Sequence, residues 1–423
     1  MEKTLLKIIS ISLIISSAVF FSSCNKDNNT ESSAPSAAEA SITEASDSNE
    51  NSSATPDVPD SSGSEISEAS HVKSTYPEEW QDNGIFSDYY EKAYLKMKEM
   101  SIEQKTGQII LGAYPSDGAY ETAKEYFLGG YLLFWKDLED KTKDQIILEN
   151  STFSQAHDIP MIISTDEEGG TVSRLSGHNL LKTDDFLSPR ELYENGGLDA
   201  IKQDAVRKSN LLSNLKINTN LAPVCDICTG EDKFMYDRSI GQDVDITCSF
   251  VREVTKISQQ NGVSVTLKHF PGYGNNTDTH TGIAIDNRNY ETFESTDFKP
   301  FQAGIDEGAH VVLVSHNIVN CMDSERPASL SPAVHDILRK KLGFTGIIIT
   351  DDLSMGAISE YSPDASPVVT AFLAGNDMLC VADIDTAYEK LLEAAKDGTI
   401  PEELLDHAVM RILSWKYAKG LIK

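Results

Sequence analysis

Eight short apolar runs, each long enough for one strand, constrain the fold more than any other feature of this sequence. They occupy residues 108–113, 129–135, 160–166, 217–224, 263–270, 310–316, 346–352 and 376–382. Most are almost continuously apolar, which is typical of parallel strands buried on both faces. Helical patterns separate or follow them at 142–157, 198–215, 246–261, 298–307, 332–342, 386–396 and 402–419.

This alternation predicts an α/β fold, specifically a TIM-type (β/α)8 barrel over residues 76–423. A doubly wound open sheet is the alternative. A Gly-x-Gly-x-x-Gly turn does not follow the first run, so the sequence gives no support for a dinucleotide site.

The first 23 residues have the pattern of an export signal. Lys3 and Lys7 precede a mostly apolar stretch over 5–21, and small residues then lead into Cys24. The segment resembles a bacterial lipoprotein signal, which implies lipidation of Cys24 and a membrane-anchored protein outside the cytoplasm. A plain secretory signal and an uncleaved anchor are the alternatives, although the run is short for a membrane span.

Residues 24–75 are expected to form a disordered tether, because they contain fourteen serines and few large apolar side chains. The whole chain has 36 basic and 66 acidic residues, a net charge of −30. Such a chain is poorly suited to neutralising phosphates, so we expect no nucleic-acid partner. Six cysteines are too few for a disulfide scaffold.

Polar side chains stand where the predicted strands end, and in a TIM barrel the carboxyl ends of the strands carry the active site. The residues at these ends are Asp166, Asp226, Lys268, His269, His316, Asp351 and Asp352. Asp, Lys and His together at several strand ends favour a catalytic pocket.

Several ordered motifs resemble glycoside hydrolase family 3, and in particular its β-N-acetylglucosaminidase branch, which includes peptidoglycan-recycling enzymes. The matching segments are 164–170 (STDEEGG), 221–226 (LAPVCD), 237–241 (DRSIG), 268–280 (KHFPGYGNNTDTH), 327–331 (PASLS), 342–346 (LGFTG) and 349–355 (ITDDLSM). The resemblance spans nearly the whole folded part.

The resemblance implies a role for each catalytic residue. Asp351 is expected to be the nucleophile of a retaining mechanism, whereas Asp352 should point elsewhere and cap the next helix. A His–Asp pair on a loop, His280 with Asp278, is expected to replace the usual second carboxylate as acid and base. Histidine suits proton transfer near neutral pH. If His280 is not the acid, Glu168 is the next candidate.

Five further residues are expected to hold the sugar: Asp166, Arg174, Arg238, Lys268 and His269. His316 is expected to form part of the wall. Two positions depart from the family pattern, because Tyr273 and Thr171 replace a histidine and an arginine. Cys225 and Cys228 have Cys-x-x-Cys spacing but no second pair, so we expect neither a metal nor a cofactor.

The sequence thus predicts an exported, lipid-anchored β-N-acetylglucosaminidase that acts on a glycan containing N-acetylglucosamine, such as a peptidoglycan fragment. A phosphorylase, an inactive glycan-binding lipoprotein and a family 3 β-glucosidase are the alternatives. The last is disfavoured by the dyad and by the lack of a second α/β domain in the sequence.

Overall fold

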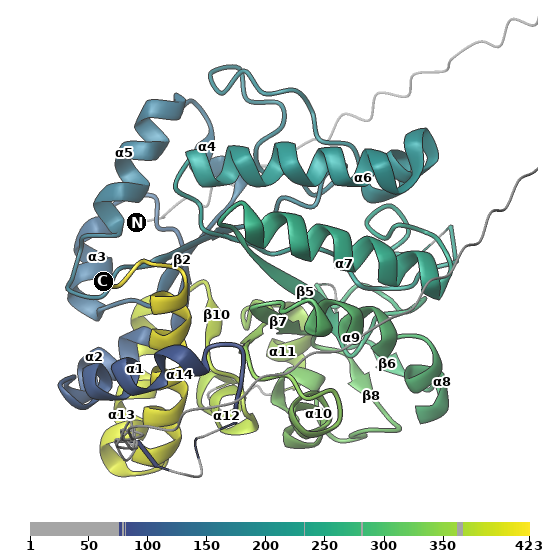
Figure 1. Ribbon diagram of the computed structural model, residues 1–423. Helices are drawn as coiled ribbons and strands as arrows, with labels where there is room; N and C mark the ends of the chain where they lie inside the picture. The colour runs from purple at the N-terminus through teal and green to yellow at the C-terminus, as the bar shows by residue number, and fades with distance from the viewer. Residues whose placement is uncertain (1–75, 78–79, 81, 232, 281, 362–366) are drawn as a thin grey trace, which may run out of the picture. The chain divides into compact units, whose positions relative to one another are not determined.

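The protein is represented by a computed structural model that describes residues 76–77, 80, 82–231, 233–280, 282–361 and 367–423 (Figure 1). The predicted signal segment, with Cys24, and the predicted tether lie outside the described residues.

Eight parallel strands form the central sheet, in the order β10-β1-β2-β3-β4-β5-β7-β9. Each lies within one of the eight predicted runs. Their bounds are β1 Ile110–Ala113, β2 Gly130–Leu133, β3 Ile162–Thr165, β4 Thr219–Asn220, β5 Ser264–Phe270, β7 Val311–Val314, β9 Ile347–Thr350 and β10 Leu379–Val381. Because β10 pairs with β1 and also meets β9, the sheet curls into a nearly closed barrel, and the predicted fold class is confirmed.

The seam between β9 and β10 is the least regular part of the barrel. A single bridge, Ile349 to Met378, joins the two strands there, and a few backbone hydrogen bonds between residues 348–350 and 377–378 accompany it. Two side chains supply further hydrogen bonds. The carboxylate of Asp377 accepts from the backbone N–H of Ile348 at 2.7 Å, and the hydroxyl of Thr350 accepts from that of Cys380 at 2.9 Å.

The strands are buried on both faces, as their composition predicts. β-Branched runs such as Ile347–Thr350 and Val311–Val314 are fully buried and fit the pleated surface of a covered sheet. One face fills the barrel, and the other packs against helices.

The seven predicted helical segments all contain helix. They correspond to α5 Lys143–Phe153, α6 Pro189–Asn214, α7 Val244–Gln260, α9 Phe298–Asp306, α10 Pro332–Asp336 with the π-helix Ile337–Lys341, α13 Ile384–Asp397 and α14 Glu402–Ala418. Helix α6 begins nine residues before the predicted segment, because Ser188 and Glu191 form a capping box at its start. Non-helical backbone at Gly196 and Gly197 then interrupts α6 just before the predicted start.

The sequence patterns did not reveal the shorter elements. These are α1 Tyr90–Lys98, α2 Ile102–Gln108, α3 Ala119–Tyr126, α4 Trp135–Leu138, α8 Tyr290–Ser295, α11 Gly356–Tyr361, α12 Pro367–Ala374, the 3₁₀ turns Ser87–Tyr89 and Ala328–Leu330, and a small parallel sheet of β6 Ile285–Asp286 with β8 Ile318–Val319. None of the helices within the described ranges combines the length and apolar character needed to cross a bilayer.

Helix α14 covers the amino-terminal end of the barrel and packs beside α1 (Figure 1). The indole of Trp415 donates to the Ser264 hydroxyl at the start of β5 at 3.0 Å. Next to it, the ammonium of Lys416 is completely buried and donates to the Gln108 side chain at 2.7 Å and to the Gly129 carbonyl at 3.0 Å. The opposite end of the barrel is therefore the open one.

Candidate active site

A cavity of about 530 Å³ opens at the carboxyl ends of the strands. Seven of the eight predicted catalytic and sugar-binding side chains line it: Asp351, His280, Asp166, Arg174, Arg238, Lys268 and His269. The eighth, Asp278, contacts His280. The structure therefore brings together residues that are up to 185 positions apart, as the count from Asp166 to Asp351 shows.

Asp351 directly follows β9, and its backbone N–H continues the pairing with β7 by donating to the Val314 carbonyl at 3.1 Å. Its carboxylate accepts from the backbone N–H of Asp352 at 3.0 Å. Burial alone would raise the pKa of Asp351, but His316, His269, this N–H and Lys268 outweigh it and hold the pKa below its ordinary value. Asp351 is therefore ionised at neutral pH.

Asp352 has a different task from its neighbour. Its carboxylate accepts from the backbone N–H and the hydroxyl of Ser354, at 2.9 and 2.8 Å. It shapes the turn after β9 but does not cap α11, because that helix begins only at Gly356. Asp352 also lines the cavity, so the expectation that it points away from the site is not met, and the expected helix cap is wrong.

His316 lies behind this turn. Its Nε2 donates to the Asp352 carbonyl at 2.9 Å, and its Nδ1 accepts from the Ser329 hydroxyl at 2.7 Å. Burial lowers the pKa of His316 below its ordinary value. Since both nitrogens are engaged, His316 supports the turn that follows Asp351.

Four charged side chains form an ion-pair cluster along the opposite wall. The ammonium of Lys268 lies 2.7 Å from a carboxylate oxygen of both Asp166 and Glu168. The guanidinium of Arg238 donates two hydrogen bonds to the Glu168 carboxylate, at 2.9 and 2.7 Å. Burial lowers the pKa of Lys268, but the two carboxylates outweigh it and raise the pKa above its usual value. The cluster places fixed donors and one partly exposed carboxylate, Asp166, at the cavity.

Glu168 is poorly suited to be the acid. Burial would raise its pKa, but Arg238 and Lys268 outweigh burial and hold the pKa far below its ordinary value. A carboxyl group that stays ionised has no proton to give, so the alternative assignment of the acid to Glu168 is disfavoured.

His269 is held from behind by Asp226, which itself does not line the cavity. The imidazole Nδ1 donates to Asp226 at 2.7 Å, and Nε2 accepts from Arg238 at 3.2 Å. Because a guanidinium only donates, this arrangement fixes the proton on Nδ1. The other oxygen of Asp226 accepts from the backbone N–H of Tyr273 at 2.7 Å.

The predicted dyad forms on the loop after β5. The Nδ1 atom of His280 lies 2.6 Å from Asp278, whose carboxylate also accepts the backbone N–H of His280 at 2.9 Å. The side chain of His280 is 57% exposed and that of Asp278 is 29% exposed. The carboxylate holds one nitrogen of the ring and leaves the other, Nε2, available toward the cavity.

Arg174 lies above the ring of Phe134 and 3.5 Å from Asp166. Its Nε atom is buried and has no hydrogen-bond partner within the described part of the chain. A buried N–H without a partner is costly, and solvent does not reach this atom.

Sequence reasoning missed the aromatic part of the wall. Phe234 packs edge-on against His280 with ring centres 5.9 Å apart, and the guanidinium of Arg238 lies over its ring at 5.1 Å. The available signal was an aromatic residue in a polar loop, four positions before Arg238. Both departures from the family pattern, Thr171 and Tyr273, also line the cavity.

The Cys225–Cys228 pair does not form a metal centre with its surroundings. Cys225 contacts the Pro223 carbonyl, and Cys228 contacts Gly230 and Asn275. A cluster of three or more potential metal ligands does not occur among the residues with described positions.

Such a cavity, with an ionised carboxylate and a carboxylate-oriented imidazole at the mouth of a (β/α)8 barrel, defines an enzyme-like site. The sequence model of the glycosyl hydrolase family 3 N terminal domain matches residues 101–415. The chain therefore belongs to glycosyl hydrolase family 3, whose members hydrolyse glycosidic bonds.

Known relatives support this membership. The chain is 30% identical over 321 residues to an uncharacterized secreted glycosyl hydrolase of Arthroderma benhamiae, covering 70% of this chain and 88% of the relative. It is 30% identical over 273 residues to a beta-hexosaminidase of Xanthomonas campestris pv. campestris, covering 63% and 81%.

A solved family 3 beta-N-acetylglucosaminidase from Paenibacillus sp. has a similar fold, with a TM-score of 0.72 and 28% identity. The match covers 77% of this chain and 64% of the Paenibacillus chain, so this protein spans slightly less than two thirds of that relative's length.

Proposed function

We propose that this protein is a retaining β-N-acetylglucosaminidase that works through a covalent glycosyl-enzyme. One observation carries the proposal: Asp351 and the Asp278-oriented His280 line the same cavity from two different loops. A carboxylate nucleophile and a separate proton donor are what retaining glycoside hydrolysis requires. The hexosaminidase relatives support the choice of sugar.

In the first step the ionised Asp351 attacks the anomeric carbon as the bond to the leaving oxygen breaks. His280 in its protonated form gives the Nε2 proton to that oxygen, and the carboxylate of Asp278 on Nδ1 stabilises the imidazolium beforehand. The products are a glycosyl ester on Asp351, a neutral imidazole and the free alcohol.

In the second step the neutral His280 takes a proton from water, and the water oxygen attacks the same anomeric carbon. The ester bond to Asp351 breaks, and its electron pair returns to the carboxylate. Two displacements give overall retention of configuration. The enzyme is restored with His280 protonated and Asp351 ionised.

The opposite wall suits a neutral, hydroxyl-rich sugar. Asp166 would accept from hydroxyl groups, whereas Arg174, Arg238, Lys268 and His269 would contact hydroxyl and acetamido oxygens. Lysine and arginine donate without accepting. Since Lys268 and Arg238 already hold carboxylates, their positions are fixed before the sugar arrives.

The substrate and location follow from the amino-terminal segment. An exported protein with a lipid on Cys24 would meet peptidoglycan, so we propose bonds between N-acetylglucosamine and N-acetylmuramic acid as the natural target. A histidine, whether neutral or protonated, would not repel the lactyl carboxylate of the latter sugar, as a second carboxylate would. The secreted relative is consistent with export.

A panel of nitrophenyl β-glycosides, assayed with and without inorganic phosphate, tests the activity. We expect turnover of the N-acetylglucosaminide, little turnover of the glucoside, and no dependence on phosphate. Turnover that requires phosphate and yields a sugar phosphate would establish a phosphorylase instead. Binding of the sugar without any turnover would establish a glycan-binding protein.

A further inference from the structure

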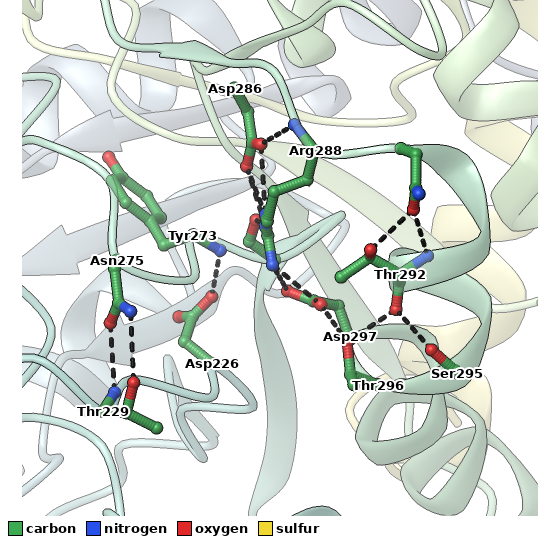
Figure 2. A network of polar contacts seen from close by, with 12 residues as sticks. Asp226, Thr229, Tyr273, Asn275, Asp286, Arg288, Thr292, Ser295, Thr296 and Asp297 are labelled. Carbon is green, nitrogen blue, oxygen red and sulfur yellow. Dashed lines mark hydrogen bonds and ion pairs between the residues drawn. The ribbon is translucent and has the colours of Figure 1, made fainter.

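The loop that carries the dyad, residues 271–280, is anchored in two separate halves. Figure 2 shows the first half, where Arg288, itself paired with Asp286 and Asp297, donates to the Gly272 carbonyl at 3.1 Å. Gly272 has φ +123°, and a Cβ there would collide with the Asp297 carboxylate.

Two further anchors complete the first half. The backbone N–H of Tyr273 donates to Asp226, while its phenol ring extends away from that contact (Figure 2). The Asn275 side chain accepts from the backbone N–H groups of Thr229 and Gly230, at 3.0 and 3.1 Å. These contacts hold the loop as far as residue 275, and other contacts hold the part that carries Asp278 and His280.

The second half is centred on Thr279, which lies between the two members of the dyad. Thr279 is fully buried, although Asp278 and His280 on either side are partly exposed. Its hydroxyl forms a short hydrogen bond with the phenol oxygen of Tyr273. Its carbonyl accepts from the backbone N–H of Ala357 at 3.2 Å.

Ala357 lies in the first turn of α11, a few residues after Asp351. The loop also touches the residue before it, because a Cβ on Gly356 would come within 2.9 Å of the His280 carbonyl oxygen. Thr279 is therefore held between the end of β5, through Tyr273, and the turn that follows the nucleophile.

We propose that Tyr273 and Thr279 are positioning residues that lock the acid/base loop against the nucleophile's turn. The ring of Tyr273 is itself immobilised, because it is buried against His269 and Phe234 with ring centres 5.4 and 5.9 Å away. Tyr273 is held at Asp226 by its backbone N–H and at Thr279 by its phenol, and so sets where His280 emerges. Tyr273 also lines the cavity, but in this proposal both residues act through His280. This inference rests on the proposed function for its catalytic consequence but not for its structural one.

Loss of this contact should reduce activity mainly on substrates with poor leaving groups. Tyr273→Phe should lower kcat/KM on a disaccharide about tenfold, because a misplaced acid protonates a poor leaving group slowly. An activated dinitrophenyl glycoside needs little protonation, so its glycosylation rate should change by less than about twofold. Thr279→Val should lower kcat/KM on the disaccharide as much as Tyr273→Phe does, and Thr279→Ser should keep it near the wild-type value. The double variant Tyr273→Phe/Thr279→Val should lose no more activity than either single variant.

Tyr131→Phe is the matched control. Tyr131 is equally buried, and its phenol donates to the Ala119 carbonyl at 2.7 Å, away from the cavity lining. It should lose stability without changing the ratio of the two substrates. Equal losses on both substrates in Tyr273→Phe would overturn the catalytic part of the proposal.

Hydrogen exchange of the peptide over residues 277–280 decides the structural part without any substrate. Tyr273→Phe and Thr279→Val should speed exchange there about tenfold, whereas Tyr131→Phe should leave it unchanged. Unchanged exchange in both loop variants would overturn the lock. If the wild type hydrolyses no glycoside, the proposed function fails while this measurement still decides whether the lock exists.

Discussion

The buried ammonium of Lys416 makes a quantitative prediction about stability and pH. Within the described residues its contacts are two neutral acceptors, the Gln108 side chain and the Gly129 carbonyl, and no carboxylate offsets its charge. Burial lowers the pKa of Lys416 from 10.5 to about 7. The unfolded chain, in which the lysine is hydrated, keeps the ordinary value.

The sign follows from the number of protons bound. Between pH 7 and 10.5 the unfolded state binds more protons at this site than the folded state, so the free energy of unfolding rises with pH across that window. With these two pKa values, the contribution of Lys416 increases by about 2 kcal/mol between pH 7 and 9. Below pH 7 the penalty for the charged amine is at its full size.

Lys416→Met should remove this dependence. Urea unfolding of the wild type and the variant at pH 7 and pH 9 gives the difference between their free energies of unfolding at each pH. The contributions of other titrating groups largely cancel in that difference. The absolute stability is a poorer test, because the methionine also leaves two buried oxygens without a donor. The neighbouring His157 titrates below this pH window, because burial and the charge of Lys416 lower the pKa of His157 to about 4.

Lys105→Met is the matched control, because Lys105 is also buried but pairs with Asp406 at 2.5 Å. That variant should keep the pH slope of the wild type. A difference between the wild type and Lys416→Met that stays constant within about 0.5 kcal/mol from pH 7 to 9 would refute the reasoning.

Three further predictions concern function and location. Asp351→Ala should abolish turnover while far-UV circular dichroism stays unchanged, and a fluorinated mechanism-based sugar should label Asp351; labelling of Asp352 in mass spectrometry would contradict the assignment. His280→Ala should lose roughly 10²–10⁴-fold on a disaccharide and much less in the glycosylation burst of a dinitrophenyl glycoside, with Asp278→Asn showing a weaker form of the same pattern; equal losses in that step would mean that His280 shapes the pocket only. Cys24→Ala should move the protein from the membrane to the soluble fraction, and retention on the membrane would point to an uncleaved helix.

The sequence predicted the barrel well because its strands are covered on both faces. Runs such as 346–352 are continuously apolar up to the polar residues at their carboxyl ends, so their length and spacing carry the signal without help from tertiary contacts. The short elements were missed for the opposite reason. Helix α11 has six residues and β6 has two, and contacts with other parts of the chain define both.

The site was partly predictable. The motifs indicated that Asp351 and the His280–Asp278 pair belong to one site, but they did not reveal the partner of each charge. From the sequence, Glu168 was the second candidate for the acid. The structure pairs it with Arg238 and Lys268, which are 70 and 100 positions away along the chain. Likewise, Tyr273 was a puzzling departure from a motif, and its reach to Thr279 depends on how the loop folds back.

The seam of the barrel has a consequence for how the enzyme would fail on heating. Asp351 follows β9, and that strand is joined to the β10 segment by a short set of backbone hydrogen bonds around one bridge and by the side chains of Asp377 and Thr350. Side-chain hydrogen bonds are lost locally more easily than a long ladder of backbone bonds. Inactivation should therefore begin at this edge, and glycosidase activity should disappear at a lower temperature than the helical signal of the barrel.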